Sequence, residues 1–312
     1  MGILIDVVLP VFLIIGFGYA AARARLLSAD AVDGLMRFSQ SFAIPCLLFR
    51  SISQLDLSTS FDPGLLLSFY LGAFIAFAAG FFGSHRWFDR PLDESVAIGF
   101  ACMFSNSLLM GLSITERAYG KDALAGNYAI IAMHSPMFYA FGIGLMEWVR
   151  SRGQGLSGTA LGRQVFRAIL AQPLVLGIVA GVVVNLSGLP LPEAVGAAVD
   201  MMGRAGLPAA LFGLGGVLLR YRPEGDKSLI ALVVAITLVL HPVVTYVLAR
   251  WVFVIDVASL RSAVVTAAMP PGVNAYLFAH LYSTGRRVAA SAVLIATALS
   301  ILTAWFWLQL LP

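Results

Sequence analysis

Charged residues are scarce in this chain. Asp, Glu, Lys and Arg make up 12% of its 312 residues, whereas hydrophobic residues make up 60%. A typical soluble domain has about a quarter of its residues charged and about half of them apolar. The shortage of charge therefore excludes an ordinary soluble protein and predicts that most of the molecular surface faces lipid.

Cysteine is also rare, and no metal-binding motif is present. Cys46 and Cys102 both lie in apolar runs, a placement that indicates neither a disulfide nor a metal site. We therefore expect no cofactor and no metal. The net charge of +4 could favour nucleic acid, but the arginines fall in short loops between apolar runs, so we expect no nucleic-acid partner.

Long apolar runs dominate what is present. A spanning helix needs about 20 mostly apolar residues, and continuous runs of this kind argue against a membrane β-barrel, whose strands alternate. The sequence predicts an all-α integral membrane protein, embedded in the lipid bilayer, with ten helices near 3–22, 31–52, 63–83, 94–114, 123–149, 166–187, 193–219, 228–253, 259–281 and 288–311.

The basic residues give this arrangement an orientation. Of the 20 Lys and Arg residues, 13 fall in loops on one side of the ten predicted spans, 5 on the other and 2 inside helices. Cytoplasmic loops carry the excess of positive charge. We therefore expect a multi-pass protein of the plasma membrane, most simply a bacterial inner membrane, with both termini on the non-cytoplasmic side.

Two halves of five helices each must have opposite topology, and such inverted repeats are typical of secondary transporters. A weak internal repeat supports this division. The run Ile44-Pro45-Cys46-Leu47-Leu48-Phe49 matches Leu207-Pro208-Ala209-Ala210-Leu211-Phe212 at an offset of 163 residues, which also pairs Gly18 with Gly181. We therefore expect a first repeat over residues 1–150, a cytoplasmic linker over 151–165 and a second, inverted repeat over 166–312.

The fourth helix of each half carries a polar interruption. Residues 94–114 contain Phe104-Ser105-Asn106-Ser107, and residues 259–281 contain Pro270-Pro271-Gly272-Val273-Asn274. Two prolines remove backbone donors and Gly272 adds freedom, so the ninth helix must break. At membrane depth, the freed backbone groups need protein or a water-filled cavity. The starting half-helices suit an anion, which makes Ser105, Asn106, Ser107, Gly272, Val273 and Asn274 candidate substrate-binding residues.

Few ionisable residues lie within the predicted spans. His134, His241 and His280 do, and such residues are functional candidates. His134 is included in the candidate substrate site, with a histidine hydrogen-bonded to a neighbouring helix as the alternative. Asp33 with Arg37 and Asp200 with Arg204 have helical i,i+4 spacing and predict structural ion pairs. Neither broken helix carries an acid at its interruption, which disfavours sodium coordination there.

Several motifs together resemble one known family. They are NSLLMGL from Asn106, AMPPGV from Ala268, residues 44–49 and the glycine-rich run from Ala205 to Gly215. Over nearly the whole chain they are similar to the auxin efflux carrier family, which includes plant PIN-type carriers and bacterial malonate or malate carriers. This family often has proline just before the equivalent of Asn106 and again after the equivalent of Gly111. This chain has Ser105 and Ser113 at those positions, so the break in the fourth helix should be softer than the break in the ninth.

The resemblance implies a fold like that of the bile-acid symporters. Helices 1, 2, 6 and 7 would form a scaffold and a homodimer interface, and helices 3–5 and 8–10 a transport domain that moves as an elevator. Substrate would bind where helices 4 and 9 cross at the midplane, with Asn106 at the position of the family's carboxylate-binding asparagine.

The function predicted from these features is secondary transport of a small organic anion by alternating access. The anion could be an auxin-like monocarboxylate or a malonate- or malate-like dicarboxylate; direction and coupling ion stay open. A sodium-coupled bile-acid-type symporter is the first alternative. An intramembrane enzyme would need a paired nucleophile and base at the break, and a receptor would usually carry a soluble output domain. The sequence favours neither, and we expect no enzymatic activity.

Overall fold

A computed structural model describes residues 2–55, 62–151, 162–163, 172–188 and 190–312. The regular elements of these residues are helices, and α-helices alternate with short π-helical turns. Most of the predicted linker, and the start of the predicted helix 166–187, lie outside the described residues.

Among the residues that the structure describes, six helices are long and apolar enough to cross a membrane. They span Leu4–Arg23, Pro63–Trp87, Lys121–Arg150, Glu193–Leu218, Lys227–Val252 and Arg286–Leu310. Two shorter apolar helices span Pro173–Ser187 and Val257–Ala267. The prediction of an all-helical membrane protein is confirmed, whereas the count of ten membrane crossings stays a prediction.

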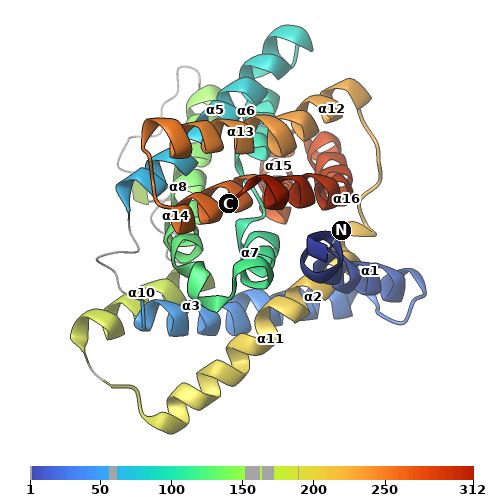
Figure 1. The fold of residues 1–312 in the computed structure, drawn as a ribbon. Coiled ribbons are helices and arrows are strands. Elements are labelled where there is room, and N and C mark those ends of the chain that lie inside the picture. Colours follow the sequence, from blue (N-terminus) through green and yellow to red (C-terminus); the bar gives the residue numbers. More distant parts are fainter. Residues whose placement is uncertain (1, 56–61, 152–161, 164–171, 189) are drawn as a thin grey trace. The chain divides into compact units, whose positions relative to one another are not determined.

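The helices, labelled in Figure 1, belong to two compact units of the chain. Unit 1 consists of Met1–Leu9, Phe61–Val165 and Tyr221–Pro312, and unit 2 of Pro10–Ser60 and Phe166–Arg220. Each unit therefore draws on both halves of the sequence.

Unit 2 contains α1 (Leu9–Arg23) from Pro10 onward, α2 (Ala29–Phe38), the π-helical turn η2 (Ser39–Ala43), α3 (Ile44–Ser53), α10 (Pro173–Ser187) and α11 (Glu193–Leu218). Helix α3 packs against α10 and α11. Glycines let these backbones approach closely. A Cβ added at Gly18 would meet the backbone of Phe212, and one added at Gly181 would lie 2.8 Å from the Phe49 carbonyl oxygen.

These two contacts are related to each other by the sequence repeat. The offset of 163 residues that pairs Gly18 with Gly181 also pairs Phe49 with Phe212. Gly18 in the first half contacts Phe212 in the second half, and its counterpart Gly181 contacts Phe49, the counterpart of Phe212. Such an exchange is what two equivalent helix pairs would produce if the halves of the chain pack around a pseudo-two-fold axis.

The ion pairs of unit 2 differ from those that sequence spacing predicts. Asp33 pairs with Arg220 at 2.8 Å and Asp200 pairs with Arg50 at 2.9 Å, so the prediction of local pairs with Arg37 and Arg204 was wrong. Both observed pairs join residues far apart in the sequence, because helix packing brings these ends together. All four side chains are partly exposed, so the pairs contribute little to stability.

Unit 1 contains α5 (Pro63–Trp87), α6 (Leu92–Met103), α7 (Leu112–Tyr119), α8 (Ala125–Arg150) and, from the second half, α12 (Lys227–Ala235), α13 (His241–Val247), α14 (Val257–Ala267), α15 (Val273–Leu281) and α16 (Arg286–Leu310). Short π-helical or 3-10 turns join several of them: η1 (Leu4–Val8), η3 (Ser107–Gly111), η4 (Lys121–Leu124), η5 (Ile236–Leu240) and η6 (Leu248–Val252). Helix α5 packs against α6, α13 and α14, and α6 packs against α8 and α15. The core is aromatic: Phe100 and Phe278 stack with ring centroids 3.9 Å apart.

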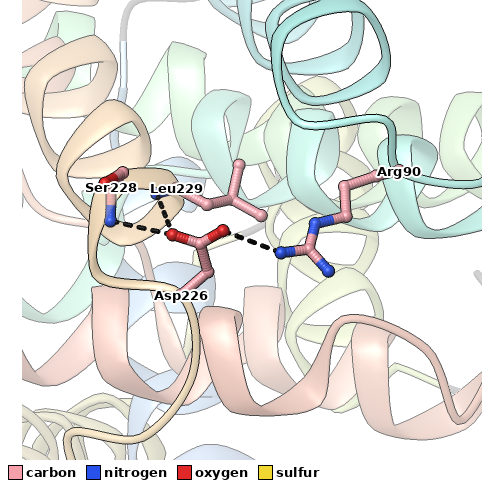
Figure 2. Close-up of polar contacts among 4 residues, drawn as sticks. All are labelled: Arg90, Asp226, Ser228 and Leu229. Atoms are coloured by element: carbon pink, nitrogen blue, oxygen red, sulfur yellow. Dashed lines mark hydrogen bonds and ion pairs between the residues drawn. The ribbon is translucent and has the colours of Figure 1, made fainter.

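Aspartates begin three helices of unit 1 by capping free backbone amides. Asp62 caps α5, Asp256 caps α14 and Asp226 caps α12. Figure 2 shows that Asp226 accepts from the amides of Ser228 and Leu229, at 3.0 and 3.2 Å, while Arg90 donates to its other oxygen at 2.8 Å. The Leu229 amide, together with the Arg90 and Ser228 donors, lowers the pKa of Asp226. The stabilisation is therefore present at neutral pH and lost as the pH falls through that lowered pKa.

Candidate functional site

Two interrupted helices of unit 1 meet at one point. The first stops at the end of α6, at Met103, and resumes at Ser107 with η3, which continues into α7. The second stops at the end of α14, at Ala267, and resumes at Val273 with α15. The first interruption, residues 104–106, is shorter than the second, residues 268–272. The lack of prolines in the first segment accounts for this difference, since only the second contains residues that cannot donate to the helical ladder.

The interrupted segments pair with each other through their backbones. Ser105 and Pro271 form an isolated antiparallel bridge. The Asn106 amide donates to the Pro270 carbonyl at 2.8 Å, and the Gly272 amide donates to the Phe104 carbonyl at 2.9 Å. These two bonds satisfy backbone groups that would otherwise be costly at membrane depth. The two segments are thereby joined through their backbones, by bonds that use no side chain.

Two half-helices begin at this crossing without side-chain caps. Asn106 precedes η3 and Gly272 precedes α15, and neither start has a side-chain hydrogen bond to its first turn. The first-turn amides of a helix have no intrahelical partner and give that end a partial positive charge. The crossing therefore offers backbone donors without a fixed cationic side chain.

The side chains of the first interruption are buried and largely unpaired. Asn106 is 6% exposed and Ser105 is 3% exposed. The Ser105 hydroxyl has no hydrogen-bond partner among the described residues, whereas Ser107 donates to the Ser105 carbonyl at 3.3 Å. No side-chain hydrogen bond of Asn106 is formed within the described part of the chain. An amide can donate two hydrogen bonds, so Asn106 is available to a ligand.

The residues of the second interruption lie in two groups. Pro270, Pro271 and Gly272 are buried against the first interruption, while Val273 and Asn274 are half-buried in the first turn of α15. The structure thus brings Ser105 and Asn106 together with Pro270, Pro271 and Gly272. Asn274 follows them on α15, and its side chain forms no hydrogen bond with Asn106 in the described residues.

Gly272 does not use the backbone freedom that the sequence suggested. Its φ of −71° and ψ of 163° are open to any residue. A methyl group there would lie 3.6 Å from the Asn106 Cα atom and 3.7 Å from the Ser105 carbonyl oxygen, which is ordinary contact. The break therefore depends on the prolines rather than on this glycine.

We expect Gly272→Ala to fold normally and to be as stable as the wild type, or up to about 1 kcal/mol more stable, because the unfolded chain loses freedom. Thermal unfolding of purified protein checks this expectation. A marked loss of stability would contradict the open geometry at this position. If the stability is unchanged, any loss of ligand affinity in this variant means that the added methyl group interferes with the ligand directly.

His134 lies beside the crossing on α8. It is 3% exposed, its ring centroid is 4.6 Å from that of Phe104, and the backbone of Ser105 faces it. Neither ring nitrogen has a hydrogen-bond partner in the described residues. The nearest polar group is the Ser105 backbone, so a role in the site and a structural contact with the first interruption both stay predictions for His134. His280, by contrast, is exposed on α15.

One buried polar residue near the crossing, Asn127, is not predicted by any sequence pattern. Asn127 is fully buried on α8 and donates to the hydroxyl oxygens of Thr115 on α7, at 3.2 Å, and of Thr266 on α14, at 3.0 Å. Its carbonyl oxygen has no partner in the described residues. It ties both interrupted helices to α8. A single asparagine in an apolar run has no pattern that would reveal this role.

Clustered His, Cys, Asp or Glu ligands are absent from the part of the chain that the structure describes. Within the residues that the structure describes, no group of three or more His, Cys, Asp or Glu side chains is placed to hold an ion. The chemistry of the crossing is that of neutral donors: amide N–H groups, hydroxyls and an imidazole.

Comparison with known proteins identifies relatives over nearly the whole length of the chain. Residues 3–308 match the family model described as Membrane transport protein. A Rhizobium meliloti protein, provisionally named a malonate transporter, is 27% identical over 95% of this chain and 92% of its own length. An uncharacterised transporter of Methanothermobacter thermautotrophicus is 25% identical over 97% and 96% of the two chains. Auxin efflux carrier component 8 of Arabidopsis thaliana is 21% identical over 93% and 92%.

The family match spans nearly every residue and agrees with the apolar helices. This chain is a membrane transporter and belongs to the membrane transport protein family that includes the auxin efflux carriers.

Proposed function

We propose that this protein is a secondary transporter of a small organic anion, with the crossing of the two interrupted helices as its substrate site. The observation that carries the proposal is the unpaired Asn106 side chain between two uncapped helix starts. Backbone and amide donors can bind a carboxylate, and without a lysine or arginine they can also release it. Ser105, Ser107, Gly272, Val273, Asn274 and His134 complete the proposed site.

The relatives' names favour carboxylates as substrates. Malonate is a dicarboxylate and auxin is an aromatic monocarboxylate, and one relative is named for each. Both ligands share the group that backbone amides and Asn106 would recognise. We therefore propose the carboxylate as the common element and leave the rest of the molecule to be identified by binding.

We also propose that the two units have different roles in transport. Unit 2, built from α1–α3, α10 and α11, would be the scaffold and unit 1, which holds the crossing, would be the transport domain. The exchanged contacts of Gly18 and Gly181 support an inverted repeat of residues 1–150 and 166–312. Exposed apolar side chains of unit 2, including Phe17, Val183 and Met201, suit lipid or a second copy, and mass measurement in mild detergent tests the homodimer.

A thermal-shift screen of the purified protein tests the function. We expect stabilisation by at least one of malonate, malate and indole-3-acetate. Because no acid lies at the crossing, replacing sodium by potassium should change the dissociation constant by less than about threefold, or roughly 0.7 kcal/mol. Absence of stabilisation by every organic acid of a broad panel would overturn the proposal.

One observation favours the sodium-coupled alternative. The buried Asn127 carbonyl oxygen has no partner among the described residues and lies with two threonine hydroxyls, and hard cations prefer oxygen ligands. A loss of affinity of tenfold or more without sodium would therefore move the protein to the symporter class.

The bias of basic residues predicts where the ends of the chain lie. A C-terminal alkaline phosphatase fusion should be active and a C-terminal fluorescent fusion dark, because the C-terminus is proposed to lie outside the cytoplasm. A bright fluorescent fusion with an inactive phosphatase would refute the orientation or the count of ten spans.

A further inference from the structure

Two buried imidazoles of unit 1 flank one aromatic ring. The Phe69 ring centroid on α5 lies 5.7 Å from that of His134 on α8 and 5.4 Å from that of His241 at the start of α13. His134 and His241 are 3% and 1% exposed. Both histidines therefore belong to one cluster inside the unit that contains the crossing.

These imidazoles are not explained by packing alone. Both nitrogens of His134 and Nε2 of His241 are buried without a partner in the described residues, as are the Ser105 and Thr245 hydroxyls. Thr245 lies one helical turn after His241, and both face Gly72 on α5. Buried polar atoms are nearly always hydrogen-bonded, and such exceptions call for water, an ion or a functional role.

The surroundings of the pair carry no counter-charge. The titratable groups that border it are Tyr70 on α5 and Tyr139 on α8; the Tyr70 hydroxyl donates to the Ile130 carbonyl at 2.7 Å. The first interruption contributes Phe104, and α13 contributes Thr245, neither of which titrates. Among the described residues, burial is the main influence on both imidazoles. His134 is also affected by His241 and the Ser105 backbone, and His241 by the Phe69 backbone, but neither is affected by a carboxylate, lysine or arginine.

We propose that His134 and His241 form a proton-binding site that takes up a proton from water when an organic anion binds at the crossing. This inference rests on the proposed function. A buried imidazolium needs a nearby negative charge, and the protein provides none beside the pair. His134 faces the Ser105 backbone, next to Asn106, so a bound carboxylate would supply that charge.

Proton and anion should then bind cooperatively. The bound anion raises the affinity for the proton by the same factor by which the bound proton raises the affinity for the anion. Like charges on both rings would repel, so the pair should hold one proton and not two. Anion affinity should therefore rise as the pH falls, by up to about tenfold per pH unit, and a pH gradient would drive net transport of the anion.

Isothermal titration calorimetry at pH 7, in two buffers of different ionisation enthalpy, measures anion binding and proton uptake together. Malonate and indole-3-acetate are the probes. For the wild type we expect uptake approaching about one proton per bound anion. The double variant His134→Gln/His241→Gln should still bind, more weakly, with uptake below about 0.2 proton and no dependence of affinity on pH.

The exposed His280 provides the matched control, and His280→Gln should take up as many protons as the wild type. Binding by the wild type without proton uptake would overturn this inference alone, as would undiminished uptake by the double variant. Failure of the wild type to bind any organic acid would overturn the proposed function and this inference together. If the double variant does not fold, wild-type titrations at pH 6 and pH 8 decide the matter.

Discussion

Replacing Gly18 by alanine should strongly destabilise the protein, because the added methyl group would overlap the backbone of a neighbouring helix. The new Cβ would occupy the position of the Phe212 backbone, with its carbonyl oxygen nearest. A backbone cannot move aside as a flexible side chain can, so α1 and α11 would have to separate. Overpacking of this kind typically costs about 1–3 kcal/mol and sometimes more, and we expect about 3 kcal/mol here.

The same helix contains its own control. Gly16 lies two residues away on α1, and a Cβ there would meet nothing within 4 Å. Gly16→Ala should be neutral or stabilising by up to about 1 kcal/mol, because alanine is the better helix former. Gly181→Ala should fall between the two, since its Cβ would lie 2.8 Å from the Phe49 carbonyl oxygen.

Thermal unfolding of the three variants in one detergent gives the ranking directly. The expected order of stability is Gly16→Ala, then Gly181→Ala, then Gly18→Ala. Equal stability of Gly18→Ala and Gly16→Ala would contradict the close approach of α1 and α11. It would also remove the main structural support for the sequence repeat, because the exchanged contacts depend on both glycines.

The positions of the helices could be read from the sequence because lipid imposes a simple rule. A span needs a long apolar run, and the predicted ranges 63–83 and 288–311 correspond to α5 and α16. The interruption of the ninth helix was equally accessible, since Pro270 and Pro271 cannot donate backbone hydrogen bonds. Chemistry intrinsic to the residues was enough in both cases.

Details that depend on neighbours far along the chain could not be read in this way. The i,i+4 spacing of Asp33 and Arg37 is real, but Arg220 arrives from another helix and pairs with Asp33 instead. The π-helical turn η3 after Asn106 is not marked by any proline or glycine at its start. Asn127 gains its role only because α7 and α14 place threonines against it.

The candidate site falls between these two cases. Asn106 and Pro270 could each be singled out from sequence, and the structure joins them through a backbone hydrogen bond of 2.8 Å. What the sequence could not give is that the Asn106 side chain has no protein partner in the described residues. That property separates a residue that holds the fold from one that is free to hold a ligand.

Asn106→Ala should leave the fold intact, because the bond to Pro270 uses the backbone amide that alanine retains. It should remove a hydrogen bond to a charged group, worth roughly 1.5–3 kcal/mol, or about a ten- to hundredfold loss of affinity. Calorimetric titration with whichever organic acid stabilises the wild type measures this loss, and unchanged thermal unfolding of the free variant serves as its control.

Asn106→Asp tests the sign of the ligand's charge at the same position. Aspartate is nearly isosteric with asparagine, but it replaces two donors by a negative charge that would face the carboxylate. The Asn106→Asp variant should therefore bind an anion more weakly than the Asn106→Ala variant does, because electrostatic repulsion adds to the lost hydrogen bond. If the substrate is a cation, the Asn106→Asp variant should bind it as tightly as the wild type does, or more tightly. Unchanged affinity in both variants would remove Asn106 from the site, and tighter binding in Asn106→Asp would overturn the assignment of an anionic substrate.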